Sequence, residues 1–211
     1  MKIMRFRFLS PLDPKSFYSF PNIITLTRLI ASLTFFTLAA IKLSPTLNFI
    51  GLGLHWAGDV ADGILARRTK QETILGAEID IIADRVEAIF FYVNFLSFNP
   101  RLFLPIAIYL VDFAFVDFYL SYQFIKYPII SPNYFYLVDK KVYRYNFSPG
   151  AKFANSTVVA LLLIFLPAWQ VVATVFALGL VGVKLRSILW LRQKPGWLPP
   201  KPENQLKEVV P

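Results

Sequence analysis

Four aspartates lie at regular spacing in one short stretch of this chain, DVADGILARRTKQETILGAEIDIIADR. Asp59 and Asp62 are three residues apart, and Asp80 and Asp84 are four residues apart, so each pair lies on one face of a helix. Carboxylates packed this closely repel one another unless a cation neutralises them. Clustered oxygen ligands are what Mg²⁺ and Mn²⁺ prefer. The pattern therefore predicts a divalent metal site able to hold a phosphoryl group and an attacking oxygen.

Small residues and one arginine are interspersed with these acids. Gly63, Ala66 and Gly76 remove side-chain bulk near the carboxylates, which leaves room for a nucleotide against the helix backbone. Arg67 supplies a planar guanidinium suited to a diphosphate. The stretch resembles no Walker loop, so we expect the chemistry to rest on acids and metal.

The elements that position these residues are strongly apolar. Of the 211 residues, 56% are hydrophobic and only 17% are charged, against about 25% charged in a soluble domain. Several apolar runs approach the roughly 20 residues that cross a bilayer. These features indicate an integral membrane protein. The chain has no cysteine, which excludes disulfides, a thiolate nucleophile and cysteine-based metal centres.

We predict an all-α fold with six transmembrane helices. The last apolar region would be about 60 Å long as a single helix, twice the thickness of a bilayer core, so it must turn near Pro167 and Gln170. The predicted spans cover about residues 23–41, 47 to the aspartate motif, 75–98, 102–125, and two helices within 151–191, with a loop over about 126–150. The predicted divisions are an N-terminal interfacial segment (1–20), a six-helix catalytic domain (21–192) and a cytoplasmic tail (193–211).

The basic residues indicate the orientation. Outside the predicted spans, only Lys42 and Arg101 fall on one side of the membrane, and the other Lys and Arg residues, Lys184 and Arg186 included, fall on the opposite side. The positive-inside rule places the termini and the aspartate motif in the cytoplasm. We expect a multi-pass protein of the cell inner membrane. Its net charge of +9 is interpreted as topology and contact with anionic lipid, not with nucleic acid.

The aspartate stretch resembles the signature of the CDP-alcohol phosphotransferase (CDP-alcohol phosphatidyltransferase) family, class I. The family pattern is Asp-x-x-Asp-Gly-x-x-Ala-Arg, eight residues, then Gly-x-x-x-Asp-x-x-x-Asp. This chain matches it at Asp59, Asp62, Gly63, Ala66, Arg67, Gly76, Asp80 and Asp84. The segment from Pro21 through Thr25 to Arg28 looks like the start of the family's first helix.

The resemblance implies a reaction and a set of roles. An alcohol attacks the β-phosphate of a CDP-linked lipid, expected to be CDP-diacylglycerol, and CMP is released. A homodimer is also implied. By analogy, two Mg²⁺ or Mn²⁺ ions are held by Asp59, Asp62, Asp80 and Asp84, Asp84 also deprotonates the acceptor, and CDP is bound by Thr25, Gly63, Ala66, Arg67 and Gly76.

The acceptor alcohol stays open at this point. Ile81 and Arg85 follow the third and fourth aspartates, where many glycerophosphate-type members carry Pro and Lys. Arg85, Lys152 and Arg186 are candidates to bind a phosphate on the acceptor, which favours glycerol 3-phosphate or inositol phosphate over serine, choline or ethanolamine. The alternative is that these residues face anionic lipid headgroups.

Three further polar residues lie in apolar surroundings. His55 is interpreted as hydrogen-bonded within a packed bundle, with orientation of a ligand carboxylate as the alternative. Asp112 and Asp117 are interpreted as pairing with Arg28 or Arg85, with a polar cavity as the alternative. The alternative function is an ion or proton-coupled transporter that uses intramembrane acids. Against it, the motif acids gather on one side of the membrane and no inverted repeat is visible. A third possibility is a catalytically silent scaffold with the same fold. The intact acids argue against it, because a silent protein would be free to lose them.

Overall fold

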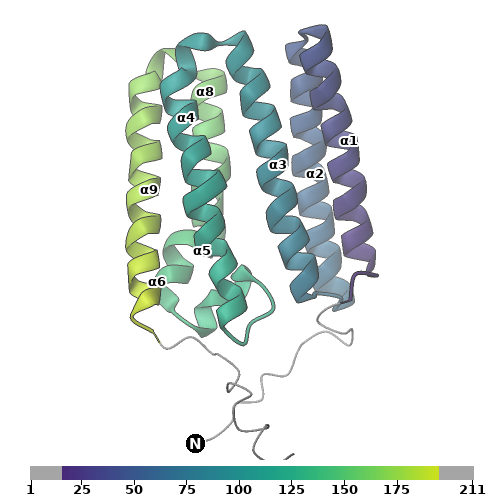
Figure 1. The fold of residues 1–211 in the computed structure, drawn as a ribbon, viewed down its shortest axis with the longest axis vertical. Coiled ribbons are helices and arrows are strands. Elements are labelled where there is room, and N and C mark those ends of the chain that lie inside the picture. The colour runs from purple at the N-terminus through teal and green to yellow at the C-terminus, as the bar shows by residue number, and fades with distance from the viewer. Residues whose placement is uncertain (1–15, 195–211) are drawn as a thin grey trace, which may run out of the picture.

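The computed structural model describes residues 16–194, which form helices and no strand. Six long helical rods make up this part of the chain (Figure 1). The first three are α1 (Phe20–Lys42), α2 (Pro45–Thr69) and α3 (Ile74–Phe98). The fourth joins η1 (Pro100–Leu102), α4 (Phe103–Val111), η2 (Asp112–Asp117), α5 (Phe118–Tyr122) and η3 (Gln123–Lys126).

The remaining rods follow one short connecting helix, η4 (Pro132–Leu137). The fifth rod joins α6 (Lys140–Val142), η5 (Tyr143–Phe147), α7 (Pro149–Phe153), η6 (Ala154–Val158) and α8 (Val159–Phe165). The sixth joins η7 (Pro167–Trp169) and α9 (Gln170–Arg192). The turn between them lies where the sequence predicts it.

The predicted loop over residues 126–150 is wrong in its second half. Helix begins at Lys140, because the Asp139 carboxylate caps it by accepting the backbone N–H groups of Lys141 and Val142 at 2.8 and 3.0 Å. Most of the predicted interfacial segment and nearly all of the predicted tail lie outside the described residues.

Four of the rods are long and apolar enough to cross a membrane: Phe20–Lys42, Pro100–Lys126, Lys140–Phe165 and Pro167–Arg192. Helices α2 and α3, of 25 residues each, have the length but carry the motif acids. The predicted count of six spans is therefore not confirmed by length and composition.

A tight connection brings the two halves of the aspartate motif together. Helix α2 ends at Thr69, and its C-cap, Lys70, adopts a left-handed conformation with φ 55°. Helix α3 is preceded by its N-cap, Thr73, whose hydroxyl accepts the N–H of Gly76 at 2.9 Å. Because only two residues, Gln71 and Glu72, separate the cap of α2 from that of α3, the end of one helix must lie beside the start of the other.

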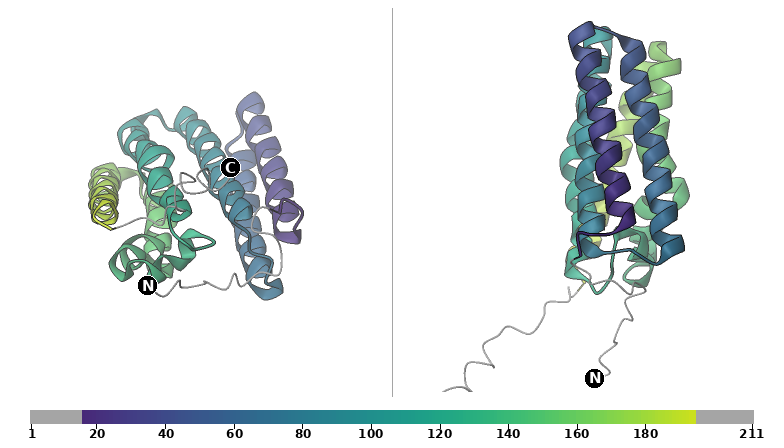
Figure 2. Two further views of the ribbon diagram at one scale, coloured as in Figure 1. Left: turned by 60° about the horizontal axis from the view of Figure 1, so that its bottom comes forward. Right: turned by 90° about the vertical axis from the view of Figure 1, so that its right-hand side faces the viewer.

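The rods form two groups that meet along α3. Helices α1, α2 and α3 contact one another, and α4 and α8 contact α9. Figures 1 and 2 show α1 and α2 on one side of α3 and the later rods on the other. A large apolar cluster around Phe91 and Tyr109 fills the end far from the motif, and a second around Phe124 and Phe135 lies near the motif. The motif is therefore held between two packed regions.

Candidate active site

The guanidinium of Arg28 lies in the middle of the aspartate motif, although it comes from α1. Its side chain is 1% exposed. It reaches the acids past Gly58 of α2, where an added Cβ would lie 2.4 Å from Arg28 Cδ. A glycine is thus required at this close approach.

All four motif aspartates contact this guanidinium. Arg28 Nη1 lies 3.3 Å from Asp59 Oδ1 and 4.0 Å from Asp62 Oδ2. Arg28 Nη2 lies 3.3 Å from Asp80 Oδ1 and 3.1 Å from Asp84 Oδ1. The structure therefore brings the four predicted metal ligands together at the end of α2 and the start of α3.

A fifth carboxylate, Glu87, belongs to the same cluster and was missed from the sequence. It is fully buried, accepts a hydrogen bond from the Ser32 hydroxyl, and lies 3.4 Å from Arg28 Nη2. His55 Nδ1 lies 2.9 Å from Glu87 Oε2, which confirms the interpretation of His55 as a hydrogen-bonded residue of the bundle. The sequence signal that could have identified Glu87 is its position three residues after Asp84, on the same helical face.

The donor set fits divalent cations. One oxygen from each of Asp59, Asp62 and Asp80 lies within 4.8 Å of the others, and ligand atoms of His55, Asp84 and Glu87 form a second such group. Within residues 16–194, the Arg28 guanidinium contacts all five carboxylates, and the Arg85 guanidinium adds one contact, 3.9 Å from Asp84 Oδ2. The surplus of negative charge on oxygen ligands is what Mg²⁺ and Mn²⁺ neutralise.

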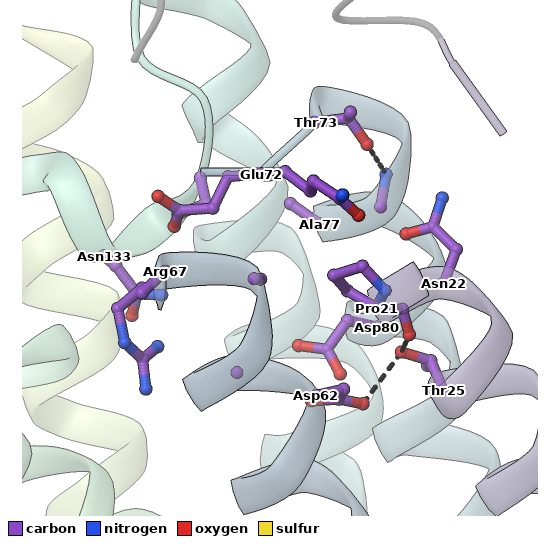
Figure 3. A pocket seen from close by; sticks show the side chains of 15 residues that line it. Pro21, Asn22, Thr25, Asp62, Arg67, Glu72, Thr73, Ala77, Asp80 and Asn133 are labelled. Atoms are coloured by element: carbon purple, nitrogen blue, oxygen red, sulfur yellow. Dashed lines mark hydrogen bonds between the residues drawn. The ribbon is translucent and has the colours of Figure 1, made fainter. Parts of the chain in front are cut away.

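A first cavity opens beside the motif and contains every residue predicted to bind CDP. Its lining residues are Pro21, Asn22, Thr25, Asp62, Gly63, Ala66, Arg67, Gln71, Glu72, Thr73, Gly76, Ala77, Asp80, Ser131 and Asn133. Figure 3 shows Thr25 beside Asp62, with the Thr25 hydroxyl donating to Asp62 Oδ2 at 2.8 Å. An added Cβ at Gly76 would lie 2.6 Å from Asn22 Oδ1, so a side chain at position 76 would clash with Asn22 in the wall of this cavity.

A second cavity, of about 210 Å³, lies on the other side of Asp80. Its lining residues are His55, Trp56, Asp59, Ala77, Asp80, Ile81, Asp84, Arg85, Phe113, Asp117, Ser121, Ser131, Pro132, Asn133, Asn146, Phe147, Lys152, Asn155 and Ser156. The two cavities share Ala77, Asp80, Ser131 and Asn133. Two molecules bound there would meet at Asp80.

The connection after the fourth rod contributes Ser131 and Asn133 to the lining of both cavities. Burial and the Glu72 carboxylate raise the pKa of the Tyr134 hydroxyl above its usual range, so this group stays protonated. It donates to Glu72 Oε2 at 2.6 Å. This bond ties the connection to the segment between α2 and α3. Ser131 and Asn133 are cavity residues that the sequence did not single out.

The three predicted phosphate-binding residues have different surroundings. Lys152 lines the second cavity and donates to Asn133 Oδ1. Arg85 lines it too. Arg186 is not among the residues that line either cavity, and its guanidinium lies 4.9 Å from the centre of the Trp190 ring. The structure therefore places Lys152 and Arg85, but not Arg186, on the wall of one cavity.

Arg85 is itself part of a second buried charge cluster. Its Nη2 pairs with Asp117 and donates to Ser121 Oγ at 3.2 Å. Lys184 of α9 pairs with Asp112 and lies 3.2 Å from Asp117 Oδ1. The expected pairing of Asp117 with Arg85 is confirmed.

Of the two alternative partners of Asp112 and Asp117, Arg28 pairs instead with the motif acids. One expectation about this region is wrong. Lys184, assigned from the sequence to the cytoplasmic surface, is 1% exposed inside the bundle. The reason is that Asp112 and Asp117, two buried acids on the fourth rod, require a counter-charge at position 184.

Comparison with known proteins gives a family and one curated relative. Residues 18–183 match CDP-alcohol phosphatidyltransferase. The chain is 34% identical over 106 residues to a CDP-diacylglycerol–glycerol-3-phosphate 3-phosphatidyltransferase of Cereibacter sphaeroides. The matched part is 47% of this chain and 48% of the relative, so the chain spans about half the length of that protein. No solved structure matches the chain.

Proposed function

Because this chain belongs to the CDP-alcohol phosphatidyltransferase family, we propose that it transfers a phosphatidyl group from CDP-diacylglycerol to an alcohol, with release of CMP. The observation that carries the proposal is the pair of cavities that meet at Asp80. A transferase without a covalent intermediate needs its two substrates in contact, and two adjoining cavities supply that arrangement.

The first cavity is assigned to the CDP group. Thr25, Gly63, Ala66, Arg67 and Gly76 all line it. The glycines leave backbone accessible to the nucleotide, and the Arg67 guanidinium suits two phosphates. The diacylglycerol chains of the donor would extend into lipid.

Two divalent ions, Mg²⁺ or Mn²⁺, are assigned to the four motif aspartates. When bound, such ions stabilise negative charge on a transferring phosphoryl group. Asp62 lines only the first cavity, Asp59 and Asp84 only the second, and Asp80 both. The carboxylates therefore surround the place where the phosphoryl group changes partner.

Asp84 is assigned as the general base. It lines the second cavity, where the acceptor hydroxyl would lie. As the hydroxyl oxygen forms its bond to the β-phosphorus, its proton moves to an Asp84 oxygen and the bond from phosphorus to the CMP oxygen breaks. Atoms and charge balance without a covalent phosphatidyl-enzyme, so we expect sequential kinetics.

The second cavity is assigned to the acceptor, for which we propose glycerol 3-phosphate. Lys152 and Arg85 place positive charge on its wall. Part of the Arg85 charge is already matched by Asp117, so Lys152 is the stronger candidate to bind a phosphate. The name of the relative from Cereibacter sphaeroides supports this acceptor over inositol phosphate.

The membrane arrangement is also a proposal. We propose that α2 and α3 cross the membrane with the four apolar rods, and that the motif end faces the cytoplasm of the inner membrane. The homodimer stays a proposal from the resemblance. Cysteine accessibility is a direct test, because the chain contains no cysteine of its own. A single cysteine at Gln71 should react from the cytoplasmic side only.

The decisive experiment is CMP release by the purified protein. With CDP-diacylglycerol, Mn²⁺ and glycerol 3-phosphate, we expect CMP and a phosphatidylglycerophosphate product identified by mass spectrometry. The transporter alternative predicts ion flux in proteoliposomes without any need for a CDP-lipid. Failure of a folded sample to release CMP with any of a panel of alcohols would exclude the proposed activity.

A further inference from the structure

Two residues that line the second cavity each carry a buried side-chain oxygen without a hydrogen-bond partner in the described part of the chain. The two atoms are Asn146 Oδ1 and Ser131 Oγ. Asn146 is 2% exposed and Ser131 is 7% exposed. Buried polar atoms in native proteins are nearly always bonded, so an unpaired one in a cavity wall points to a ligand.

The orientation of the Asn146 amide is fixed by its neighbours. Its Nδ2 donates both hydrogens, to Val142 O at 3.0 Å and to Ser187 Oγ at 2.7 Å. The Ser187 hydroxyl donates in turn to Val183 O at 2.9 Å. Rotating the amide by 180° would place Oδ1 against the Val142 carbonyl oxygen, so the observed orientation is the favourable one.

Asn146 Oδ1 is therefore a hydrogen-bond acceptor and requires a donor. The donors that a small alcohol substrate offers are hydroxyl and ammonium groups. Lys152 and Arg85 line the same cavity, together with Asp59, Asp80, Asp84 and Asp117. With two divalent ions on the motif acids, the wall carries a net positive charge, which opposes an ammonium group and favours an anionic substrate. A hydroxyl on a phosphorylated alcohol satisfies both requirements.

We propose that Asn146 Oδ1 accepts a hydrogen bond from a second hydroxyl of a polyol phosphate acceptor, the hydroxyl that does not attack phosphorus. Ser131 Oγ, at the junction of the two cavities, adds a second polar contact to bound substrate. The inference rests on the proposed phosphatidyl transfer and assigns Asn146 as a specificity-determining residue. A site built around such a bond rejects an analogue that lacks the hydroxyl, because its acceptor is then left unpaired.

The test compares glycerol 3-phosphate with 3-hydroxypropyl phosphate. Both carry a primary alcohol and a phosphate, and only the first has a hydroxyl on the middle carbon. With the wild-type protein in nanodiscs, CDP-diacylglycerol and Mn²⁺, we expect kcat/KM from CMP release to be at least about tenfold lower for the analogue. This comparison needs no variant.

The variant Asn146→Ala should remove the discrimination. Its kcat/KM should fall about tenfold with glycerol 3-phosphate, mainly through KM, and stay unchanged with the analogue. The matched control is Asn94→Ala. Asn94 is also buried and donates to two oxygens, Phe36 O at 2.8 Å and Asn48 Oδ1 at 3.1 Å, but it lines neither cavity. The control should lose thermal stability and keep the wild-type preference.

Each outcome separates the inference from the proposed function. Equal use of both substrates by the wild type, or an equal loss on both in Asn146→Ala, would overturn the role of Asn146 and leave phosphatidyl transfer standing. CMP release only with serine, ethanolamine or choline would do the same. Absence of CMP release with every alcohol would overturn phosphatidyl transfer itself. Loss of discrimination confined to the Asn146 variant supports the inference.

Discussion

Two clusters of charged side chains meet along α3, and they differ in the balance of positive and negative charge. In the first, Asp59, Asp62, Asp80, Asp84 and Glu87 surround Arg28. In the second, Asp112 and Asp117 face Arg85 and Lys184, two acids against two bases. The Asp112 and Lys184 side chains are buried, where an unmatched charge is costly, whereas the Asp59 and Asp80 side chains are 46% and 39% exposed.

The difference in balance indicates a difference in role. A balanced group satisfies itself and can join two rods permanently. A group with surplus carboxylates needs a cation from solution, and this need makes it a metal site. Arg85 lies 3.9 Å from Asp84 Oδ2, so the balanced cluster also supports the acidic one. Substitutions in the acidic cluster should therefore mainly change turnover and Mn²⁺ binding. Substitutions in the balanced cluster should mainly lower folding stability.

The largest effect is expected for Asp80→Asn. Asp80 is shared by both cavities, so its loss should lower turnover by about a thousandfold or more and weaken Mn²⁺ binding. In metal-free protein the same change removes repulsion, so the thermal midpoint should stay the same or rise. CMP release and thermal unfolding with and without Mn²⁺ measure both effects. A large drop in metal-free stability would show that the acids are structural.

Asp84→Asn should lower turnover by about a hundredfold or more, because it removes the proposed base. Mn²⁺ affinity should fall less than in Asp80→Asn. Isothermal titration of both variants with Mn²⁺, beside single-turnover CMP release, separates the two roles. Near-normal turnover would exclude Asp84 as the base.

In the balanced cluster, Lys184→Met should cost about 3–5 kcal/mol of stability, because Asp112 loses its counter-charge and Asp117 keeps only that of Arg85. Lys184→Arg should keep most of that stability. Adding Asp112→Asn to Lys184→Met should also recover much of the loss, since one positive and one negative charge are then removed together. Mn²⁺ should not rescue any of these variants. Rescue by the metal would mean that the two clusters are not distinct.

Arg28→Gln should make metal-free protein less stable by about 2 kcal/mol and make the stabilisation by Mn²⁺ larger than in the wild type. The reason is that the five carboxylates then lose the guanidinium that contacts all of them and depend more strongly on the metal. Gly58→Ala should act in the same direction, because its Cβ would displace the Arg28 side chain. Thermal midpoints measured over a Mn²⁺ series test the prediction. An unchanged response to Mn²⁺ in both variants would contradict it.

The smallest effect is expected where a charge lies at the edge of the bundle. Burial opposes ionisation of Asp139, but hydrogen bonds from Lys194 and the backbone of α6 outweigh it and lower the pKa of Asp139. Its stabilising effect is thus present above the ordinary Asp pKa of about 3.9 and is lost as pH falls through the lower folded value. Asp139→Ala should cost about 1 kcal/mol at pH 7 and little in strong acid. Unfolding measured at both pH values tests this.

Much of the site followed from sequence alone because it depends on local spacing. Asp59, Asp62, Asp80 and Asp84 lie on two helix ends joined by a short connection, so helical periodicity and chain continuity bring them together. The same holds for the turn near Pro167, which the length of the apolar run required. Glu87 also lay within reach of this reasoning.

The partners of these residues were decided only by the tertiary structure. Arg28 and Lys184 meet their acids across different rods, and the packing of rods, not helical periodicity, selects such pairs. Asp112 and Asp117 would lie about 140° apart around an α-helix, but the π-helical turn η2 brings both to Lys184. Asn146 likewise reaches the second cavity from another rod. The sequence by itself determined which groups carry the chemistry, whereas the packing of the rods determined what each group faces.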